Sequence, residues 1–371
     1  MPEIAEIFKC YGLQYLALFA KKMLPSHKRA LYDITNCRNG AFGLHLDSCD
    51  KCGYTHLFFH SCCNRSCPKC HGSHTKKWLE DKEKLLLPTT YFHLVFTLPQ
   101  ELRLLVRANQ TVLLNCLIKA AAYAVQKLMA DERFAGNIRG IPGMLCVLHT
   151  WTRTMVYHPH VHFMVAGGVV SKDSSQWLAV KNKKFLVPLP ALSDIFRARF
   201  IKQARKEIPG IELPNSIWKK KWVVFAKPYI KGGQRVLHYL ARYIHRIAIT
   251  NNRILWHQNG AVTFKYFDLK SRRSKRLTLP ALEFIRRFLQ HVLPRGFHKV
   301  RYYGFFAPQH RDVLHSLNVT FTRTRTNTIT IAPQRLINYH RKCPRCKTGN
   351  MIVKIHIFYK KHMILFVRPP P

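Results

Sequence analysis

The pattern of apolar and polar positions predicts a small helical part at the start of the chain. Apolar residues from Ile7 to Leu18 recur at helical spacing, and Pro25 ends the run. A shorter helical pattern covers Trp78–Leu87. Between the two patterns, residues 45–74 are polar and rich in cysteine. We therefore expect an N-terminal helical part that carries a cysteine-rich insert.

From Tyr91 onward, apolar runs of strand length alternate with longer helical patterns. Tyr91–Leu98 is a continuous apolar and aromatic run before Pro99, which is typical of a central strand. Further strands are predicted at 144–152, 161–170 and 222–226, a basic hairpin at 261–269 and 276–279, and helices at 108–132, 236–249 and 280–292. Antiparallel-looking strands that alternate with helices predict the α+β class.

The sign of the charge indicates the partner. The chain holds 61 Lys and Arg against 18 Asp and Glu, a formal net charge of +43, of which +37 falls in residues 133–371. A fold with this much self-repulsion is typical of a protein that binds a polyanion, so we expect nucleic acid. A hydrophobic content of 47% excludes wholesale disorder.

The sequence predicts a cytoplasmic protein. Its N-terminus has no basic run ahead of an apolar stretch, which is not the pattern of a signal peptide. The longest apolar stretch, Thr111–Ala130, is interrupted by Lys119 and Lys127, so no membrane span is expected. In such a compartment the twelve cysteines are read as metal ligands before disulfides.

Two cysteine pairs predict a structural zinc site. Cys49 and Cys52 form one knuckle, Cys67 and Cys70 a second, and fourteen residues separate them, which is close to the spacing of a four-cysteine zinc site. Cys62 is close enough in sequence to replace one of the four, and a second zinc ion is an open alternative. Cys343 and Cys346 form a single knuckle that by itself predicts no site.

Alternating histidines predict a second kind of metal site. In a strand, His160 and His162 point to the same face, so both imidazoles can bind one divalent ion. His149 on the preceding strand is the expected third ligand, with His93 and His158 as weaker alternatives. We expect Mg²⁺ or Mn²⁺, held with the help of phosphate oxygens.

Two tyrosines four residues apart predict a nucleophile. Tyr239 and Tyr243 lie on one face of the predicted helix. A tyrosine is a poor nucleophile near neutral pH unless cations stabilise its phenolate. Arg242, His245 and Arg246 lie on the same or the next turn and are predicted to serve this purpose and to contact DNA.

Taken together, these motifs resemble a rolling-circle transposase of the insertion sequence ninety-one family, within the HUH endonucleases. The segments that carry the resemblance are His60–Cys70, Tyr91–Pro99, Leu148–Trp151, His158–His162, Tyr239–Arg246, Phe284–Pro294, Tyr303–Phe305 and the Cys343–Cys346 knuckle. Two departures from the family pattern are Cys63 and the pair Thr152 and Arg153, and neither is expected to take part in the chemistry.

The resemblance implies an HUH nuclease domain with a central antiparallel sheet and flanking helices, preceded by a small helical zinc-binding domain. We expect boundaries at residues 1–88, 89–260 and 261–371, the last range being a basic C-terminal region. It also implies that Tyr239 and Tyr243 nick single-stranded DNA at transposon ends and in the target, and become joined to the 5′ phosphate.

Other protein classes fit less well. A plasmid rolling-circle replication initiator or relaxase shares this chemistry, and a non-catalytic zinc-containing DNA-binding protein is the non-enzyme alternative. A cut-and-paste transposase needs clustered acidic residues around two metal ions. Residues 133–371 contain only seven acidic residues, and none of them are clustered. The oligomeric state and the recognised DNA sequences do not follow from these motifs.

Overall fold

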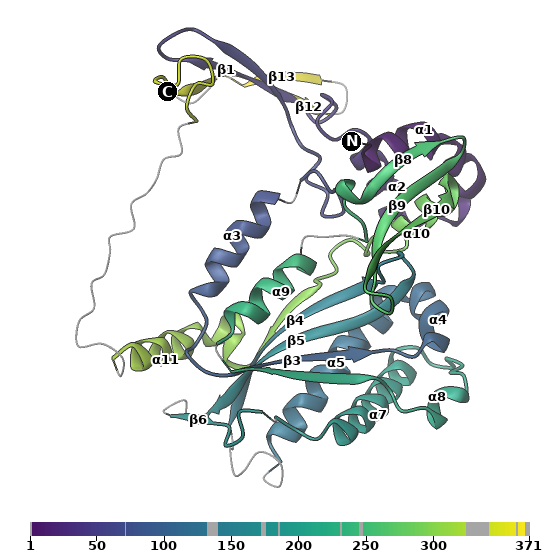
Figure 1. The fold of residues 1–371 in the computed structure, drawn as a ribbon, viewed down its shortest axis with the longest axis vertical. Coiled ribbons are helices and arrows are strands. Elements are labelled where there is room, and N and C mark those ends of the chain that lie inside the picture. Colours follow the sequence, from purple (N-terminus) through teal and green to yellow (C-terminus); the bar gives the residue numbers. More distant parts are fainter. Residues whose placement is uncertain are drawn as a thin grey trace.

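A six-stranded antiparallel sheet forms the centre of the computed structural model (Figure 1). The structure describes residues 2–70, 72–131, 140–171, 176–184, 186–230, 232–244, 248–323, 341–360 and 363–367. The strand order is β11-β4-β5-β3-β7, with β6 paired to β5. The strands are β3 (Tyr91–Thr97), β4 (Ile141–Trp151), β5 (Tyr157–Val170), β6 (Trp177–Ala179), β7 (Val224–Tyr229) and β11 (Val300–Tyr303).

Alternation along the strands divides the core into two layers. On β5, Val161 and Phe163 pack with helices on one face, while Met164 and Ala166 pack with α9 on the other. The first face is covered by α4 (Arg103–Ala108), α5 (Gln110–Met129) and α7 (Leu189–Glu207), and the second by α3 (Gly72–Glu83), α9 (Gln234–Ile244) and α11 (Arg311–Arg323). The short α8 (Ser216–Lys219) precedes β7.

The helix α5 is long and apolar enough to cross a membrane by length and composition alone. It lies under the central sheet and beside α7, and 67% of its most apolar window is buried inside the protein. This burial is the environment of a core helix.

A second core joins the N-terminal helices to residues 248–292. It contains α1 (Ile4–Phe19), α2 (Pro25–Thr35), α10 (Ala281–Leu289) and a sheet of β8 (Ile254–Gln258), β9 (Ala261–Asp268) and β10 (Arg273–Pro280). The rings of Phe8 and Phe288 meet edge to face with centroids 5.2 Å apart. Because the apolar face of α10 is covered by α1, the segment around it has no separate core.

A third sheet also connects distant segments. Its order is β13-β12-β1-β2, from β1 (Leu44–Cys49), β2 (Thr55–Phe59), β12 (Met351–Lys360) and β13 (Met363–Val367). Figure 1 shows these strands together at one end of the molecule, apart from the central sheet. The C-terminal strands therefore complete an N-terminal sheet.

The α+β class and the central antiparallel sheet agree with the sequence prediction. The consecutive ranges 1–88, 89–260 and 261–371 do not coincide with the observed cores, because segments of the last range contribute to each of the three sheets that the described residues form. Strand β11 extends the central sheet, the β9–β10 hairpin packs on α10 in the core that also contains α1 and α2, and β12 pairs with β1. Apolar surfaces far apart in the sequence cover one another, and sequence composition does not record this.

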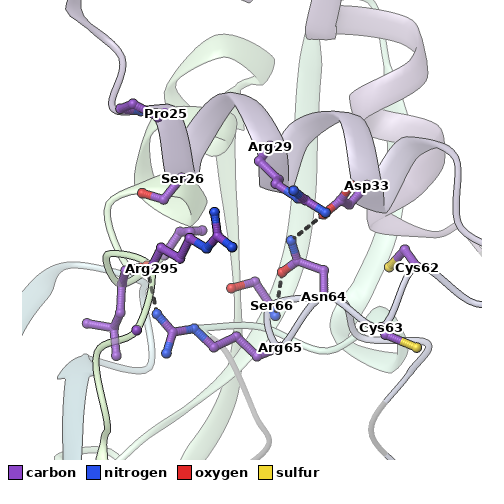
Figure 2. Close-up of a pocket in the computed structure, with 13 residues that line it drawn as sticks. Pro25, Ser26, Arg29, Asp33, Cys62, Cys63, Asn64, Arg65, Ser66 and Arg295 are labelled. Atoms are coloured by element: carbon purple, nitrogen blue, oxygen red, sulfur yellow. Dashed lines mark hydrogen bonds and ion pairs between the residues drawn. The ribbon is translucent and has the colours of Figure 1, made fainter. Parts of the chain in front are cut away.

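Arg65 links the cysteine-rich segment to the loop before β11. Its guanidinium donates hydrogen bonds to the carbonyl oxygens of Phe297 at 2.6 Å and Leu293 at 2.8 Å, and also to that of Pro294. Burial lowers the pKa of Arg65. Figure 2 shows Arg65 beside a cavity of about 700 Å³, where the Asn64 amide also donates to Asp33 on α2 at 2.8 Å.

Replacing Arg65 with Lys is expected to lower the free energy of unfolding by about 1.5–3 kcal/mol, the usual size of a hydrogen bond to a charged group. Lys keeps the charge but lacks the planar fork that reaches several carbonyl groups at once. Arg295→Lys is the matched control, since Arg295 lines the same cavity on an exposed part of the loop. Urea unfolding of both variants measures the difference, and equal midpoints would contradict the role given to Arg65.

Candidate functional site

Three histidines come together on the face of the central sheet that carries α9. His149 on β4 is the direct register partner of His160 on β5, and His162 follows two residues later on the same face. Each of the three offers a ring nitrogen, and these atoms all lie within 4.8 Å of one another. Such a donor set fits a metal ion, and it is the trio predicted from the sequence.

The surrounding hydrogen bonds orient the imidazole rings. Nδ1–H of His160 donates to the carbonyl oxygen of His158 at 2.7 Å, which leaves Nε2 of His160 as its lone-pair nitrogen. That Nε2 lies 2.7 Å from Nδ1 of His149. Nδ1 of His162 lies 2.9 Å from Nε2 of His93 on β3. His93 and His158 therefore support the trio from outside, an arrangement common around metal-binding histidines.

Burial keeps the three imidazoles neutral. It lowers the pKa of His160 to about 4 and the pKa values of His149 and His162 well below their ordinary value. The positive charge that each histidine would place on the others acts in the same direction for His149 and His162. A neutral imidazole has the lone pair that a metal ligand needs, so the trio is ready for coordination at neutral pH.

Tyr239 on α9 lies against this cluster. Its ring centroid is 5.9 Å from that of His162 and 5.0 Å from that of His93, both in edge-to-face geometry. Four apolar residues of α9 (Val236, Leu237, Leu240 and Ile244) are buried in the core layer beneath the helix. This packing holds the Tyr239 ring beside the histidines.

The other predicted residues of this helix fall outside the part of the chain that the structure describes. Tyr243 and Arg242 lie on α9, but their side chains are not described, and neither His245 nor Arg246 is described. Their predicted roles as second nucleophile and DNA contacts stay predictions.

A cavity of about 520 Å³ opens over the histidines. It is lined by the three histidines, His158, Tyr239, residues 151–154, Arg253 and the end of the β9–β10 hairpin at residues 266–269. The guanidinium of Arg253 donates to the carbonyl oxygens of Lys265 and Arg153, which ties the hairpin to the β4–β5 turn. The cavity therefore has cationic walls as well as a cluster of imidazoles.

Several residues that line this cavity were not predicted from the sequence. Thr152 and Arg153 were expected to have no part in the chemistry, yet both line the cavity. Arg253, just before β8, and Tyr266, in the predicted hairpin, were not singled out either. Only the packing of the hairpin across the end of the sheet brings them to the histidines, and no local motif marks that packing.

The cysteines form two clusters, not the single expected site. Cys37, Cys62, Cys67 and Cys70 are together in one, and Cys49, Cys52, Cys343 and Cys346 in the other. The expected partnership of the Cys49–Cys52 and Cys67–Cys70 knuckles is therefore corrected. The reason is that the first knuckle is at the tip of the β1–β2 hairpin, while β2, about 16 Å long, leads back to Cys62 near its base.

The first cluster has the geometry of a tetrahedral zinc site. Sγ of Cys70 lies 3.5 Å from that of Cys37 and 3.6 Å from that of Cys62. Four sulfurs about 2.3 Å from a tetrahedral zinc are about 3.8 Å apart, whereas a disulfide is about 2.05 Å long. Cys37 lies just after α2 and shortly before the cysteine-rich segment 45–74, and was not predicted as a ligand. Cys63 is exposed and belongs to neither cluster.

A third group on the β1–β2–β12 sheet consists of His45, His60 and His356. Nδ1 of His45 lies 3.0 Å from Nε2 of His60. The group lies on the same small sheet as the second cysteine cluster. A metal ion bound by these histidines would add to the number of ions counted in this part of the protein.

Comparisons with known families match two parts of the chain. A family model described as "Transposase zinc-binding domain" matches residues 7–98, which include all four cysteines of the first cluster. A second, described as "Putative transposase", matches residues 143–313, which include the histidine trio and Tyr239. The chain thus binds zinc through its N-terminal part and carries the three histidines within the transposase region.

Individual proteins match over greater lengths. A protein of Sinorhizobium fredii named putative transposase y4qJ is 36% identical over 96% of this chain and 96% of its own length. The transposase for insertion sequence element IS801 of Pseudomonas savastanoi pv. phaseolicola is 27% identical over 73% of this chain and 68% of its own length.

Among solved structures, a bacterial tRNA(His) guanylyltransferase-like protein aligns with a TM-score of 0.20 and 14% identity over 60% of this chain and 98% of that one, too weak a likeness to use. The two family models and the near full-length relative agree on one identity: the chain belongs to the insertion sequence ninety-one family of transposases.

Proposed function

We propose that this transposase nicks one DNA strand with Tyr239 and keeps that strand as a covalent 5′-phosphotyrosine. The observation that carries the proposal is the position of the Tyr239 ring beside His162 and His93, at the edge of the cavity that holds the histidine trio. A nucleophile and a set of metal ligands that face one cavity are the two parts that such a reaction requires.

The histidines would hold a divalent cation, Mg²⁺ or Mn²⁺. His149, His160 and His162 supply three neutral imidazole nitrogens, and the cavity leaves room beside them for phosphate oxygens. Such an ion, when bound, polarises the scissile phosphate and neutralises charge that develops on it. The buried hydrogen bonds from His160 and His162 keep the ligand set rigid while the substrate enters.

The bond changes balance as a transesterification. The Tyr239 phenol oxygen loses its proton and bonds to phosphorus, the bond from phosphorus to the 3′ oxygen breaks, and that oxygen leaves with a proton as a free hydroxyl. Arg153 and Arg253, which line the cavity, supply positive charge close to the phosphate and the developing phenolate. The phosphotyrosine preserves the bond energy, so a later strand with a free 3′ hydroxyl can be joined.

The DNA is proposed to be single-stranded, at the transposon ends and in the target. The cavity opens between the sheet and the β9–β10 hairpin, and the aromatic rings of Tyr266 and Phe267 line it. Unpaired bases stack on such rings, and cationic side chains beside them bind the backbone. Tyr243, four residues after Tyr239, is the proposed second nucleophile in rolling-circle transposition, and two nucleophiles allow the donor and target strands to be handled in turn.

The first test is the covalent adduct. Tyr239→Phe is expected to reduce adduct formation with end-labelled single-stranded DNA from the element's ends by about 10³-fold or more, as removal of a nucleophile commonly does. Denaturing gels with label at either terminus, with Mn²⁺ or with chelator, measure both the cut and the position of the attached phosphate. Tyr243→Phe and the double variant show whether the second tyrosine substitutes for the first.

Tyr302→Phe is the matched control, since Tyr302 contacts the same core layer as Tyr239 but lies away from the cavity. It is expected to form the adduct at the wild-type rate. If the wild-type protein binds the DNA but never cuts it with any metal, the covalent mechanism is wrong and a non-catalytic DNA-binding role remains. An adduct joined to the 3′ phosphate would also contradict the proposal.

The second test concerns the metal ligands. His160→Asn is expected to weaken Mn²⁺ binding by about 100-fold or more, because loss of an outer partner alone costs about 10–100-fold. Titration followed by electron paramagnetic resonance measures this without DNA. His238→Asn is the control, since His238 is exposed on α9 and pairs with Glu83 away from the cavity.

The pH dependence of Mn²⁺ binding should be flat over a wide range. Because burial lowers the pKa of His160 to about 4 and the pKa values of His149 and His162 well below their ordinary value, protons do not compete with the metal near neutrality. Affinity should stay constant from about pH 8 to about pH 6, where ordinary histidines with a pKa near 6.5 already take up protons. A loss of affinity that begins near pH 7 would contradict the neutral buried trio.

A further inference from the structure

We propose that Cys49, Cys52, Cys343 and Cys346 bind a second structural zinc ion, which fastens the C-terminal segment to the N-terminal sheet. Half of this ligand set lies beyond the region that matches the zinc-binding family model, residues 7–98. The facing cysteines of the two knuckles, Cys52 and Cys343, are 291 positions apart in the sequence. The site therefore differs in kind from the first cluster, whose four ligands lie within one short stretch.

The sulfur positions fit zinc and exclude a disulfide. Sγ of Cys49 lies 3.7 Å from Sγ of Cys346, and Sγ of Cys52 lies 3.7 Å from Sγ of Cys343. These are close to the separation of about 3.8 Å that four thiolates have around a tetrahedral zinc, and far beyond the length of a disulfide bond. Four thiolates leave no open coordination position, so the ion would be structural.

Backbone amides point at the sulfurs from both knuckles. The N–H groups of Lys51 and Cys52 donate to Sγ of Cys49 at 3.4 and 3.5 Å, and that of Gly349 donates to Sγ of Cys346 at 3.3 Å. Such donors stabilise thiolates and fix their direction, as outer partners do in metal sites. In both turns, backbone N–H groups thus donate to a cysteine Sγ, although the turns are far apart in the sequence.

The turns are also fitted to each other. The carboxylate of Asp50 accepts a hydrogen bond from the backbone N–H of Asn350 at 2.8 Å. A Cβ added at Gly349 would lie only 2.4 Å from Sγ of Cys49, so a residue without a side chain is needed there. Beyond the turns, β1 and β12 pair from Cys49 opposite Met351 to Leu44 opposite Ile357. The zinc would close the end of this strand pair.

A zinc clamp would explain how a strand so distant in sequence stays paired with β1. Closing a chain loop of this length costs conformational entropy, and a short strand pair alone offsets little of it. Four zinc–thiolate bonds would supply the missing stabilisation. The clamp would also hold a cationic segment on the N-terminal sheet, where the guanidinium of Arg341 stacks on the Phe58 ring at 4.4 Å.

Metal counting on the full chain tests the proposal. Cys343→Ser/Cys346→Ser is expected to lose one zinc per chain relative to wild type, measured by elemental analysis of the purified protein. Cys37→Ser/Cys62→Ser should lose one zinc of its own, and Cys10→Ser, an exposed cysteine outside both clusters, should lose none. An unchanged zinc content in Cys343→Ser/Cys346→Ser would overturn the proposal.

Cobalt spectroscopy separates thiolate sites from the histidine groups. With Co²⁺ in place of zinc, the sulfur-to-cobalt bands of wild type should correspond to two tetrathiolate sites, and either double variant should keep half of that intensity. Ions bound at His45, His60 and His356, or at the histidine trio, do not contribute to these bands. Wild-type intensity that corresponds to a single tetrathiolate site would contradict the second site.

Cys343→His covers the case in which the serine variant does not fold. Imidazole replaces thiolate as a zinc ligand, so zinc content should stay at the wild-type level. Half of the cobalt signal should then shift to that of a site with three sulfurs and one nitrogen. A cobalt spectrum identical to that of wild type would show that Cys343 is not a ligand and would overturn the proposal.

Discussion

The antiparallel pairing of β4 with β5 is the constraint on which the candidate site depends. Register fixes His149 opposite His160, and the two-residue repeat of a strand then brings His162 to the same face. A slip of one residue would turn the imidazoles into the layer of α5 and α7 and would turn Val161 and Phe163 out of that layer. Buried apolar residues on both faces therefore hold the register that gathers the histidines.

The same sheet buries these histidines in apolar surroundings, which lowers their pKa values. Burial holds their pKa values far below the ordinary value, so the imidazoles are neutral where an exposed histidine would titrate. The apolar face of α9 packs onto this layer and carries Tyr239 to the cluster. Packing energy thus organises the groups that we propose to be catalytic.

The rest of the molecule is assembled from segments far apart in the sequence. Phe8 meets Phe288 in one core, Arg65 binds carbonyl groups at 293–297, and β1 pairs with β12. The β9–β10 hairpin, packed on α10 in the core shared with α1 and α2, lines the cavity over the histidines. The N-terminal zinc-binding part shares its core with α10. The same helix and hairpin also contact the transposase region, so they join the two parts of the protein.

The sequence alone determined the features that depend on short-range patterns. Continuous apolar runs predicted the strands at 91–98 and 161–170. The two-residue repeat of a strand predicted the face shared by His160 and His162, and the motifs in order along the chain indicated the family. His149 also followed from sequence, because a hairpin brings its strand beside the pair.

Only the tertiary structure decided which cysteines meet and which residues wall the cavity. Cys37 joins Cys62, Cys67 and Cys70, while Cys49 and Cys52 meet Cys343 and Cys346, and Arg153 and Arg253 reach the histidines. The spacing of cysteines in a sequence predicts that they bind the same zinc ion only when the intervening chain is a tight turn. Here a strand separates the neighbouring knuckles and the packing of distant apolar faces brings the true partners together, and neither leaves a local pattern.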